Sequence, residues 1–306
     1  GHIGHVISGL AAIVNLGDGD ALDKRSAAMV VTLGEYGRFF ANGSRTGAWL
    51  VLRNALEEAT DYRDHKDDFE RGMRREYQHS VADLDALQGV ISGDIPILAS
   101  IDRASDIEVL IALTEEYGLK AIISGGTEAW MLAEELAAAD ISVILNVTSN
   151  LPGNLDRSNA RRGAANVLAG AGVRYALRDG SSQSHNARNI TQTAGNAVAD
   201  GLDWDAALRA ITLTPAEMYG VADAVGSIEA GKAADIVIWP ADPFELTTYA
   251  DQVLINGVAI PMQSRQTMLR DRYLQFDSGN PPATDLVAAQ VVDLHEFGRQ
   301  YGIFPL

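Results

Sequence analysis

The chain has no cysteine, four lysines and six histidines among its 306 residues. Without cysteine it has no disulfides, no thiolate nucleophile and no cysteine-ligated zinc or iron–sulfur site. No stretch of about 18 apolar residues is present, so no segment is predicted to span a membrane. The formal net charge of −17 argues against nucleic acid or an anionic membrane as the main partner, because phosphate backbones are bound by clustered positive charge. Six histidines leave room for at most one histidine-rich metal site.

The middle of the chain alternates short apolar runs with amphipathic stretches. With 47 % hydrophobic and 21 % charged residues, the composition is that of a globular protein with one large domain, or one domain and a small appendage. Alternating buried strands and helices predict a parallel sheet built from βα units. Four such units fit both an open doubly wound sheet and a (β/α)8 barrel. The predicted strands cover residues 95–101, 121–124, 141–147 and 173–177, and the helices 106–119, 127–139, 158–171 and 189–219.

The flanking segments have a different pattern. After Val221, turn-forming residues precede two short apolar runs at 236–239 and 253–258, which predict a small β element. Before Ile95, the sequence predicts strands at 6–16 and 29–33, a helix over 46–62, and a solvated helix face in the charge run 61–75. The tail from Gln275 is predicted to be a linker that leads to an amphipathic stretch, 285–297.

Three stretches together resemble the amidohydrolase superfamily, in its imidazolonepropionase-like and Xaa-Pro-dipeptidase-like branch. They are Val225–Trp239 with Val253–Gly257; Ala207–Glu217; and Asp102–Ile107 with Gly125–Trp130 and His185–Asn189. The resemblance implies an α/β fold, a (β/α)8 TIM-type barrel flanked by a small β-sandwich element. It implies a barrel body over 1–222 that starts after strand one, a return into the sandwich over 223–274, and a linker with a C-terminal tail over 275–306.

The resemblance also gives an expected metal centre, with histidines on the first, fifth and sixth strands and an aspartate on the eighth. Here Ser100 and Ser124 stand at the fifth-strand and sixth-strand positions, and Asp179 at the eighth. Serine is a poor substitute for imidazole as a zinc ligand. We therefore expect a degenerate metal site, in which Asp179 is the one ligand if a metal binds at all. Zinc or another divalent metal would need ligands from a missing N-terminal segment, and no other cofactor is expected.

Polar residues at the predicted strand ends form the candidate site. Among the histidines, His185 alone follows a strand end at the face where barrel chemistry takes place. The alternative is a structural ring of ion pairs and helix caps, with Asp106 and Thr127 as capping residues. The candidate catalytic residues are His185, Asp179, Asp102 and Glu128, and the candidate substrate-binding residues are Arg103, Ser100, Ser124, Asn150, Arg161 and Arg188.

Two functions follow as expectations. The first is hydrolysis of a C–N bond in a small amide, cyclic amide or dipeptide-like substrate. The second is an inactive pseudoenzyme that binds a small ligand or serves as a structural partner subunit. Expected partners are a small molecule, an N-terminal segment or second chain that completes the barrel, and further copies in a homo-oligomer. The compartment stays open. The lack of cysteine is compatible with export, and the family resemblance slightly favours a bacterial periplasm over the cytoplasm.

Overall fold

The computed structural model describes residues 4–14, 22–180 and 184–274, with backbone alone at 22, 23, 184 and 185. The chain divides into two compact units, 1–258 and 259–306. The predicted tail over 275–306, with its amphipathic stretch 285–297, lies outside the described residues. Within them, no helix is both long and apolar enough to cross a membrane.

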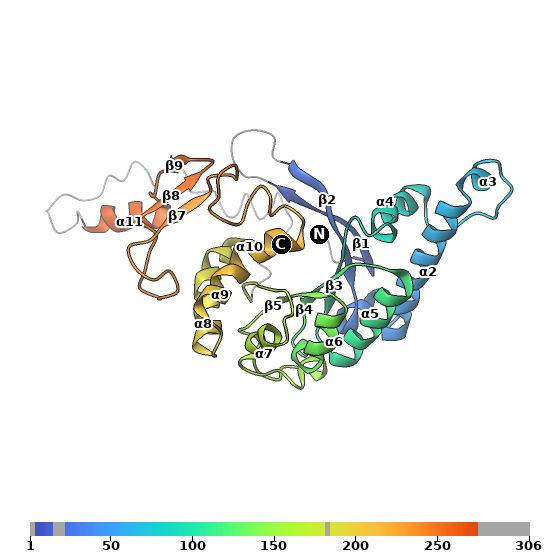
Figure 1. Cartoon of the computed structure of the whole chain (residues 1–306), viewed down its shortest axis with the longest axis horizontal. Coiled ribbons are helices and arrows are strands. Elements are labelled where there is room, and N and C mark those ends of the chain that lie inside the picture. The colour runs from blue at the N-terminus through green and yellow to red at the C-terminus, as the bar shows by residue number, and fades with distance from the viewer. Residues whose placement is uncertain (1–3, 15–21, 181–183, 275–306) are drawn as a thin grey trace, which may run out of the picture. The chain divides into compact units, whose positions relative to one another are not determined.

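The first unit is organised around a six-stranded sheet whose strands follow one another in sequence order (Figure 1). β1 and β2 pair antiparallel, and the remaining neighbours pair parallel. The expected (β/α)8 barrel, with its N-terminal strands missing from this chain, is not closed: among the described residues the sheet is open, with β1 and β6 at its ends. The strands are β1 (Ile7–Val14), β2 (Leu22–Thr32), β3 (Ile97–Ile101), β4 (Ala121–Gly125), β5 (Ser142–Leu145) and β6 (Tyr175–Leu177).

Helices cover the outer face of this sheet and enclose the main core. Alternate strand residues such as Ile97, Ala99 and Ile123 point into that core, where they pack against Leu52, Leu110 and other helix residues. Figure 1 shows α2, α5, α6 and α7 along this side. The helices up to β6 are α1 (Gly34–Gly37), η1 (Arg38–Phe40), α2 (Arg45–Asp64), α3 (Lys66–Glu70), α4 (Val81–Ile91), α5 (Ala104–Tyr117), η2 (Ala129–Leu132), α6 (Ala133–Ala138), η3 (Leu155–Arg157) and α7 (Ala164–Gly170).

The opposite face of the sheet, here called the inner face, carries the other strand residues. Ile122 and Ala176 pack there with Met218, and Leu98 and Ile144 lie beside them. Met218 ends α10, so this helix lies against the inner face. Lys24 Nζ donates to the Tyr219 carbonyl at 2.7 Å and thereby ties β2 to the end of α10. The helices after β6 are η4 (Ser184–Asn189), α8 (Ile190–Ala199), α9 (Trp204–Ile211) and α10 (Leu213–Met218).

Local capping explains where two of the helices begin, and glycine or loop geometry explains where two predicted helices differ from the structure. The Ser44 side chain accepts from Gly47 N before α2, and Ser80 forms a capping box with Asp83 at α4. The predicted helix 158–171 is wrong in its first half, because Gly163 (φ +70°) separates an irregular segment from α7. The predicted helix 127–139 consists of two pieces, η2 and α6, with Leu132 in a non-helical conformation between them.

The β element predicted after Val221 is present. β7 (Ile236–Ile238) and β8 (Gln252–Ile255) pair antiparallel, and the three-stranded sheet also includes β9 (Val258–Ile260). Gly226 (φ +98°) leads into this segment and lies close to α10, since a Cβ there would come within 2.9 Å of Ala216 Cβ. In the second unit, α11 (Arg265–Leu274) is described.

Candidate functional site

The carboxyl ends of the parallel strands share one edge of the sheet, the usual place for ligands in parallel α/β folds. Ser100 on β3 and Ser124 on β4 are register partners, and Thr32 on β2 pairs with Ser100. Both serines lie on the inner face, because they alternate with the core residues Ala99 and Ile123. Neighbouring strands are about 4.8 Å apart. Within the described part of the chain, neither hydroxyl has a hydrogen-bond partner, and both side chains are half-buried.

Asp102 follows β3 directly, but its carboxylate is filled by protein donors. Its Oδ1 accepts from the Thr127 backbone N–H at 3.2 Å and from the Thr127 hydroxyl at 2.6 Å. Its Oδ2 accepts from Arg157 Nε at 2.9 Å. Gly125 makes room for this arrangement, since a Cβ there would lie 2.8 Å from Asp102 Oδ1. Asp102 therefore connects the β4 loop to the loop after β5.

Glu128 is also engaged on both of its oxygens, and it is 3 % exposed. Oε2 accepts from the backbone N–H of Ala104, the first residue of α5, at 2.9 Å. Oε1 accepts from Asn159 N and Nδ2 at 2.9 and 3.1 Å. Trp130 Nε1 in turn donates to the Asn159 carbonyl at 2.9 Å. Glu128 thus fixes the start of α5 and the loop after β5 from one position.

A third network, which the sequence analysis did not find, is centred on Arg45 at the start of α2. Its guanidinium group bonds Glu35 at 2.8 Å, Asp106 at 2.9 Å and also Asp156. Asp156 further accepts from the Glu35 backbone N–H at 3.0 Å. Burial raises the pKa of Asp106, although the charge of Arg45 opposes this effect. The one available signal was the placement of these acids directly after predicted strands and turns.

The structure corrects the capping roles expected for Asp106 and Thr127. The N-cap of α5 is Arg103, whose side chain makes no capping bond, and Asp106 bonds Arg45 instead. Thr127 precedes the N-cap residue of η2 and donates to Asp102. Ion pairs do form near this edge, from Arg157 to Asp102 and from Arg45 to Asp106, and they connect separate segments of the chain. The two predicted residues cap neither helix start.

The remaining candidates are not brought into one cluster. Arg103 is exposed beside the Arg45 network, and Asn150 lies in the loop after β5. Asp179 is half-buried after β6 and follows Arg178, whose buried Nε has no hydrogen-bond partner among the described residues. His185 and Arg188 belong to η4, and the His185 side chain lies outside the described residues.

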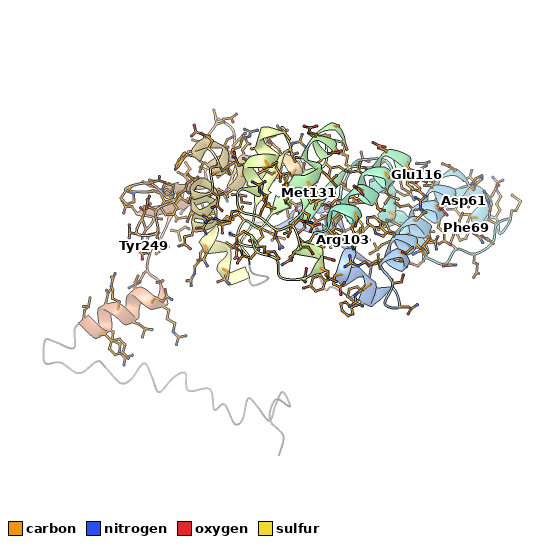
Figure 2. All side chains as sticks on the ribbon, turned by 90° about the horizontal axis from the view of Figure 1, so that it is seen from below. Asp61, Phe69, Arg103, Glu116, Met131 and Tyr249 are labelled. Carbon is orange, nitrogen blue, oxygen red and sulfur yellow. The ribbon has the colours of Figure 1, made fainter. Side chains whose placement is uncertain are left out.

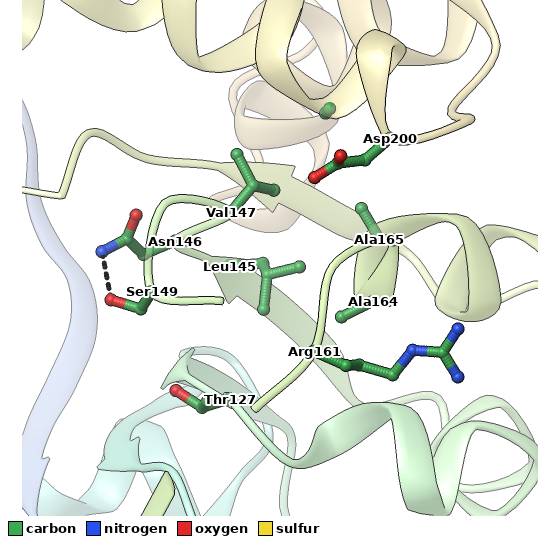
Figure 3. A pocket seen from close by; sticks show the side chains of 11 residues that line it. Thr127, Leu145, Asn146, Val147, Ser149, Arg161, Ala164, Ala165 and Asp200 are labelled. Carbon is green, nitrogen blue, oxygen red and sulfur yellow. Dashed lines mark hydrogen bonds between the residues drawn. The ribbon is translucent and has the colours of Figure 1, made fainter. Parts of the chain in front are cut away.

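Arg161 lines a small cavity on the outer side of the edge, together with Thr127, Asn146 and Asp200. Figure 3 shows its guanidinium turned away from Asn146, which instead bonds Ser149 at 2.7 Å. The guanidinium lies 4.9 Å from the centre of the Trp130 ring. The volume of this cavity is about 10 Å³, which is enough for one water molecule at most. This cavity is too small for a substrate.

The described residues do not fit the metal centre of the family pattern, which has histidine ligands on the first, fifth and sixth strands. Across 4–14, 22–180 and 184–274, no group of three or more histidine, aspartate or glutamate side chains could hold a metal ion. At the two strand ends where imidazoles are expected, the neutral hydroxyls of Ser100 and Ser124 stand side by side. Zinc sites are built from imidazole, thiolate and carboxylate ligands.

Comparison with known proteins agrees with this architecture. The sequence model of the amidohydrolase family matches residues 55–260. Amidohydrolase tasK of Hapsidospora irregularis is 38 % identical over 74 residues, which are 24 % of this chain and 8 % of tasK. The chain thus matches a small part of that relative.

Among solved structures, an amidohydrolase from Thermotoga maritima MSB8 has a TM-score of 0.74 and 24 % sequence identity, covering 84 % of this chain and 69 % of that chain. This likeness shows the fold: the sheet and its helices correspond to those of an amidohydrolase. A Xaa-Pro dipeptidase with methionine bound in its active site has a TM-score of 0.44 and 18 % identity, covering 58 % of this chain and 47 % of that one.

Proposed function

The chain belongs to the amidohydrolase family, and from that premise we propose that it hydrolyses a C–N bond of a small amide, cyclic amide or dipeptide-like substrate at the carboxyl edge of β3 to β6. The observation that carries the proposal is the pair of unpartnered hydroxyls, Ser100 and Ser124, in register on the inner face. A serine in place of a metal-binding histidine keeps a polar group at the reacting position. The serine hydroxyl can donate a hydrogen bond, but it is a poor zinc ligand.

In this proposal the two serine hydroxyls bind the oxygen of the scissile carbonyl. Donors on neighbouring strands, about 4.8 Å apart, can converge on one acceptor atom between them. Hydrogen-bond donors aimed at a developing oxyanion stabilise the transition state, and each contributes about 10²–10³-fold in rate. Ser100 and Ser124 thus supply, by hydrogen bonding, part of the carbonyl polarisation that a metal ion provides in other family members.

The attacking water must be activated by a general base. The hydrogen bonds that each candidate carboxylate accepts indicate how well it can take up a proton. The carboxylates of Asp102 and Glu128 both accept hydrogen bonds from protein donors on each oxygen. A carboxylate held in this way is less able to take a proton from water, because it would lose those bonds. We therefore assign a positioning role to Asp102 and Glu128. Asp179 and His185 are kept as candidates for the base because both follow β6 in the sequence.

A second candidate function has its own support. The engagement of Asp102 and Glu128, together with serines at two ligand positions, is also what a binding protein without turnover would need. In that case the same hydroxyl pair holds a carbonyl or carboxylate oxygen of a small ligand, and no bond is broken. The protein would then act as a pseudoenzyme or a structural partner.

The test is amine release from a panel of dipeptides, N-acyl amino acids and cyclic amides, followed with a colorimetric amine reagent. We expect substoichiometric zinc in the purified protein and turnover that falls at least tenfold in Ser100→Ala and in Ser124→Ala. Asp179→Asn or His185→Ala should abolish it. Ser92→Ala, at the exposed end of α4, is the matched control. Ligand binding without turnover selects the pseudoenzyme, and unchanged kinetics in both serine variants refute the site.

A further inference from the structure

A groove far from the strand edge lies between α2 and the segment 71–79. Its volume is about 370 Å³, within the range of small-molecule sites. Figure 2 shows Asp61, on this part of α2, close to Phe69 and well away from Arg103 at the strand edge. None of the candidate residues of the strand edge lines it. The lining residues are Asn54, Glu57, Glu58, Asp61, Arg74, Arg75, Tyr77 and Gln78.

The wall of the groove is fixed to its floor by hydrogen bonds. Glu58 accepts from the Gln78 and His79 backbone N–H groups at 3.0 and 3.1 Å, and contacts His79 Nδ1 at 2.8 Å. Asp61 accepts from the Tyr77 hydroxyl at 2.7 Å and from Arg74 at 3.1 Å. Burial and the bond to Asp61 raise the pKa of Tyr77 to about 12, so its hydroxyl stays a donor at neutral pH. The groove is therefore formed before any ligand arrives.

Aromatic packing supports the same wall from beneath. The Tyr62 ring makes edge-to-face contacts with Phe69 and Tyr77, at centroid distances of 5.9 and 6.0 Å. Phe69 and Tyr77 are 5.0 Å apart. Such aromatic pairs contribute stability beyond the burial of their area. A preformed wall lowers the ordering cost of binding.

The bonds that build the groove leave three polar groups free to meet a ligand. Arg75 on the wall makes no ion pair or hydrogen bond within the described part of the chain, and neither does the Asn54 amide on the floor. Glu57 has one long contact, with the Tyr117 hydroxyl at 3.4 Å. The groove therefore presents a guanidinium and an amide without partners in the described part of the chain, and a carboxylate with one long contact.

We propose that this groove binds a free α-amino acid as its zwitterion, with Arg75 on the carboxylate and Glu57 on the ammonium group. A guanidinium pairs well with a carboxylate because its donors form a planar fork. The lining carries three carboxylates against two guanidinium groups, so it disfavours a simple anion. Asn54 adds an amide to the same lining, which supplies both a donor and an acceptor. The site is independent of the reaction proposed at the strand edge.

The experiment is a titration of isotope-labelled protein, followed by NMR, with L-alanine and with two analogues that each lack one of its charged groups. None of the three compounds has an amide bond that a hydrolase could cleave. Propionate lacks the ammonium group, and ethylammonium lacks the carboxylate. We expect L-alanine to shift the backbone amides of 54–61 and 74–78. Both analogues should bind at least tenfold more weakly than L-alanine.

Variants separate the groove from every other site. Glu57→Gln and Arg75→Gln should each weaken L-alanine binding at least tenfold. Glu70→Gln and Arg71→Gln, exposed residues of the same region that do not line the groove, should change it less than twofold. The proposal is overturned if L-alanine shifts no amide of the groove, if the analogues bind as tightly as L-alanine, or if the two pairs of variants behave alike. Turnover at the strand edge is unaffected by any of these outcomes.

Discussion

Replacing Arg45 with methionine tests whether the network at the start of α2 stabilises the fold. Arg45 is the common partner of Glu35, Asp106 and Asp156, and it joins the β2–α2 connection to α5 and to the loop after β5. The Asp106 and Asp156 side chains are 11 % and 7 % exposed, so water cannot replace the lost cation well. Methionine keeps much of the length of the side chain and removes only its charge and donors.

The expected loss is large for a single substitution. Removing one partner of a buried ion pair costs about 3–5 kcal/mol, because the other charge stays buried and unpaired. Arg45 is 25 % exposed, so some of its interaction is screened, and we expect a loss of about 3 kcal/mol at pH 7. Urea unfolding followed by circular dichroism measures it, as a lower midpoint at an unchanged slope. Arg45→Lys, which keeps the charge without the fork, should lose less.

The pH dependence gives the sharper test. Burial already raises the pKa of Asp106, and without Arg45 the opposing influence is gone, so that pKa rises further. A carboxyl whose pKa is higher in the folded state destabilises the fold when ionised. Its penalty disappears below the unfolded value of about 3.9. The loss in Arg45→Met should therefore shrink as the pH falls from 7 towards 4.

The control for this experiment lies on the same helix. Arg53 pairs with Glu116 on the surface, where exposed pairs contribute little. Arg53→Met should cost only a small fraction of the loss in Arg45→Met. Equal losses in the two variants, or a loss in Arg45→Met that grows on acidification, would refute the reasoning.

Three further predictions concern single positions. Glu128→Gln should lower the free energy of unfolding by about 1–3 kcal/mol, seen in thermal melts, because an amide cannot accept at both ends. Gly125→Ala should destabilise by more than about 2 kcal/mol, since its Cβ would lie 2.8 Å from a carboxylate oxygen; Gly118→Ala, with open space around its Cβ, should cost only about 1 kcal/mol. Glu58→Gln should lower the free energy of unfolding at pH 7. Burial alone would raise the pKa of Glu58, but the hydrogen bonds from Gln78 and His79 have the larger effect, so the pKa is lowered. This stability is present above the ordinary value of about 4.3, so wild type and Glu58→Gln should converge on acidification.

Much of the fold follows from periodicity in the sequence. The strands at β3, β4, β5 and β6 and the long helix α2 were predicted, because alternating burial and helical spacing are local signals. Sheet closure is not local. It depends on how many strands the sheet has and on what pairs with its edges, and the described strands form an open sheet. The early part of the predicted helix 158–171 failed because Gly163 takes a left-handed conformation that the apolar spacing does not reveal.

The candidate site was predictable only in part. Residues directly after strands were identified, since parallel strands bring their carboxyl ends together. Which of them touch was not identifiable, because Arg45 and Asp156 are 111 positions apart and meet only through the fold. Asp102 and Glu128 have the residue type of catalytic acids, and the positioning role that we propose for them rests on hydrogen-bond partners that the sequence does not reveal.

The loop after β5 divides the edge into two regions with different roles. Within four residues it supplies Asp156 to Arg45, Arg157 to Asp102, and Asn159 to Glu128. It therefore connects the βα units that follow β2, β3 and β4 on the helix side of the edge, where Arg45, Asp102 and Glu128 are all engaged by protein groups. The inner face keeps hydroxyls without partners. In the proposed function, the chemistry at this edge uses those hydroxyls and residues after β6. The serine variants therefore test the function more directly than variants of the buried acids do.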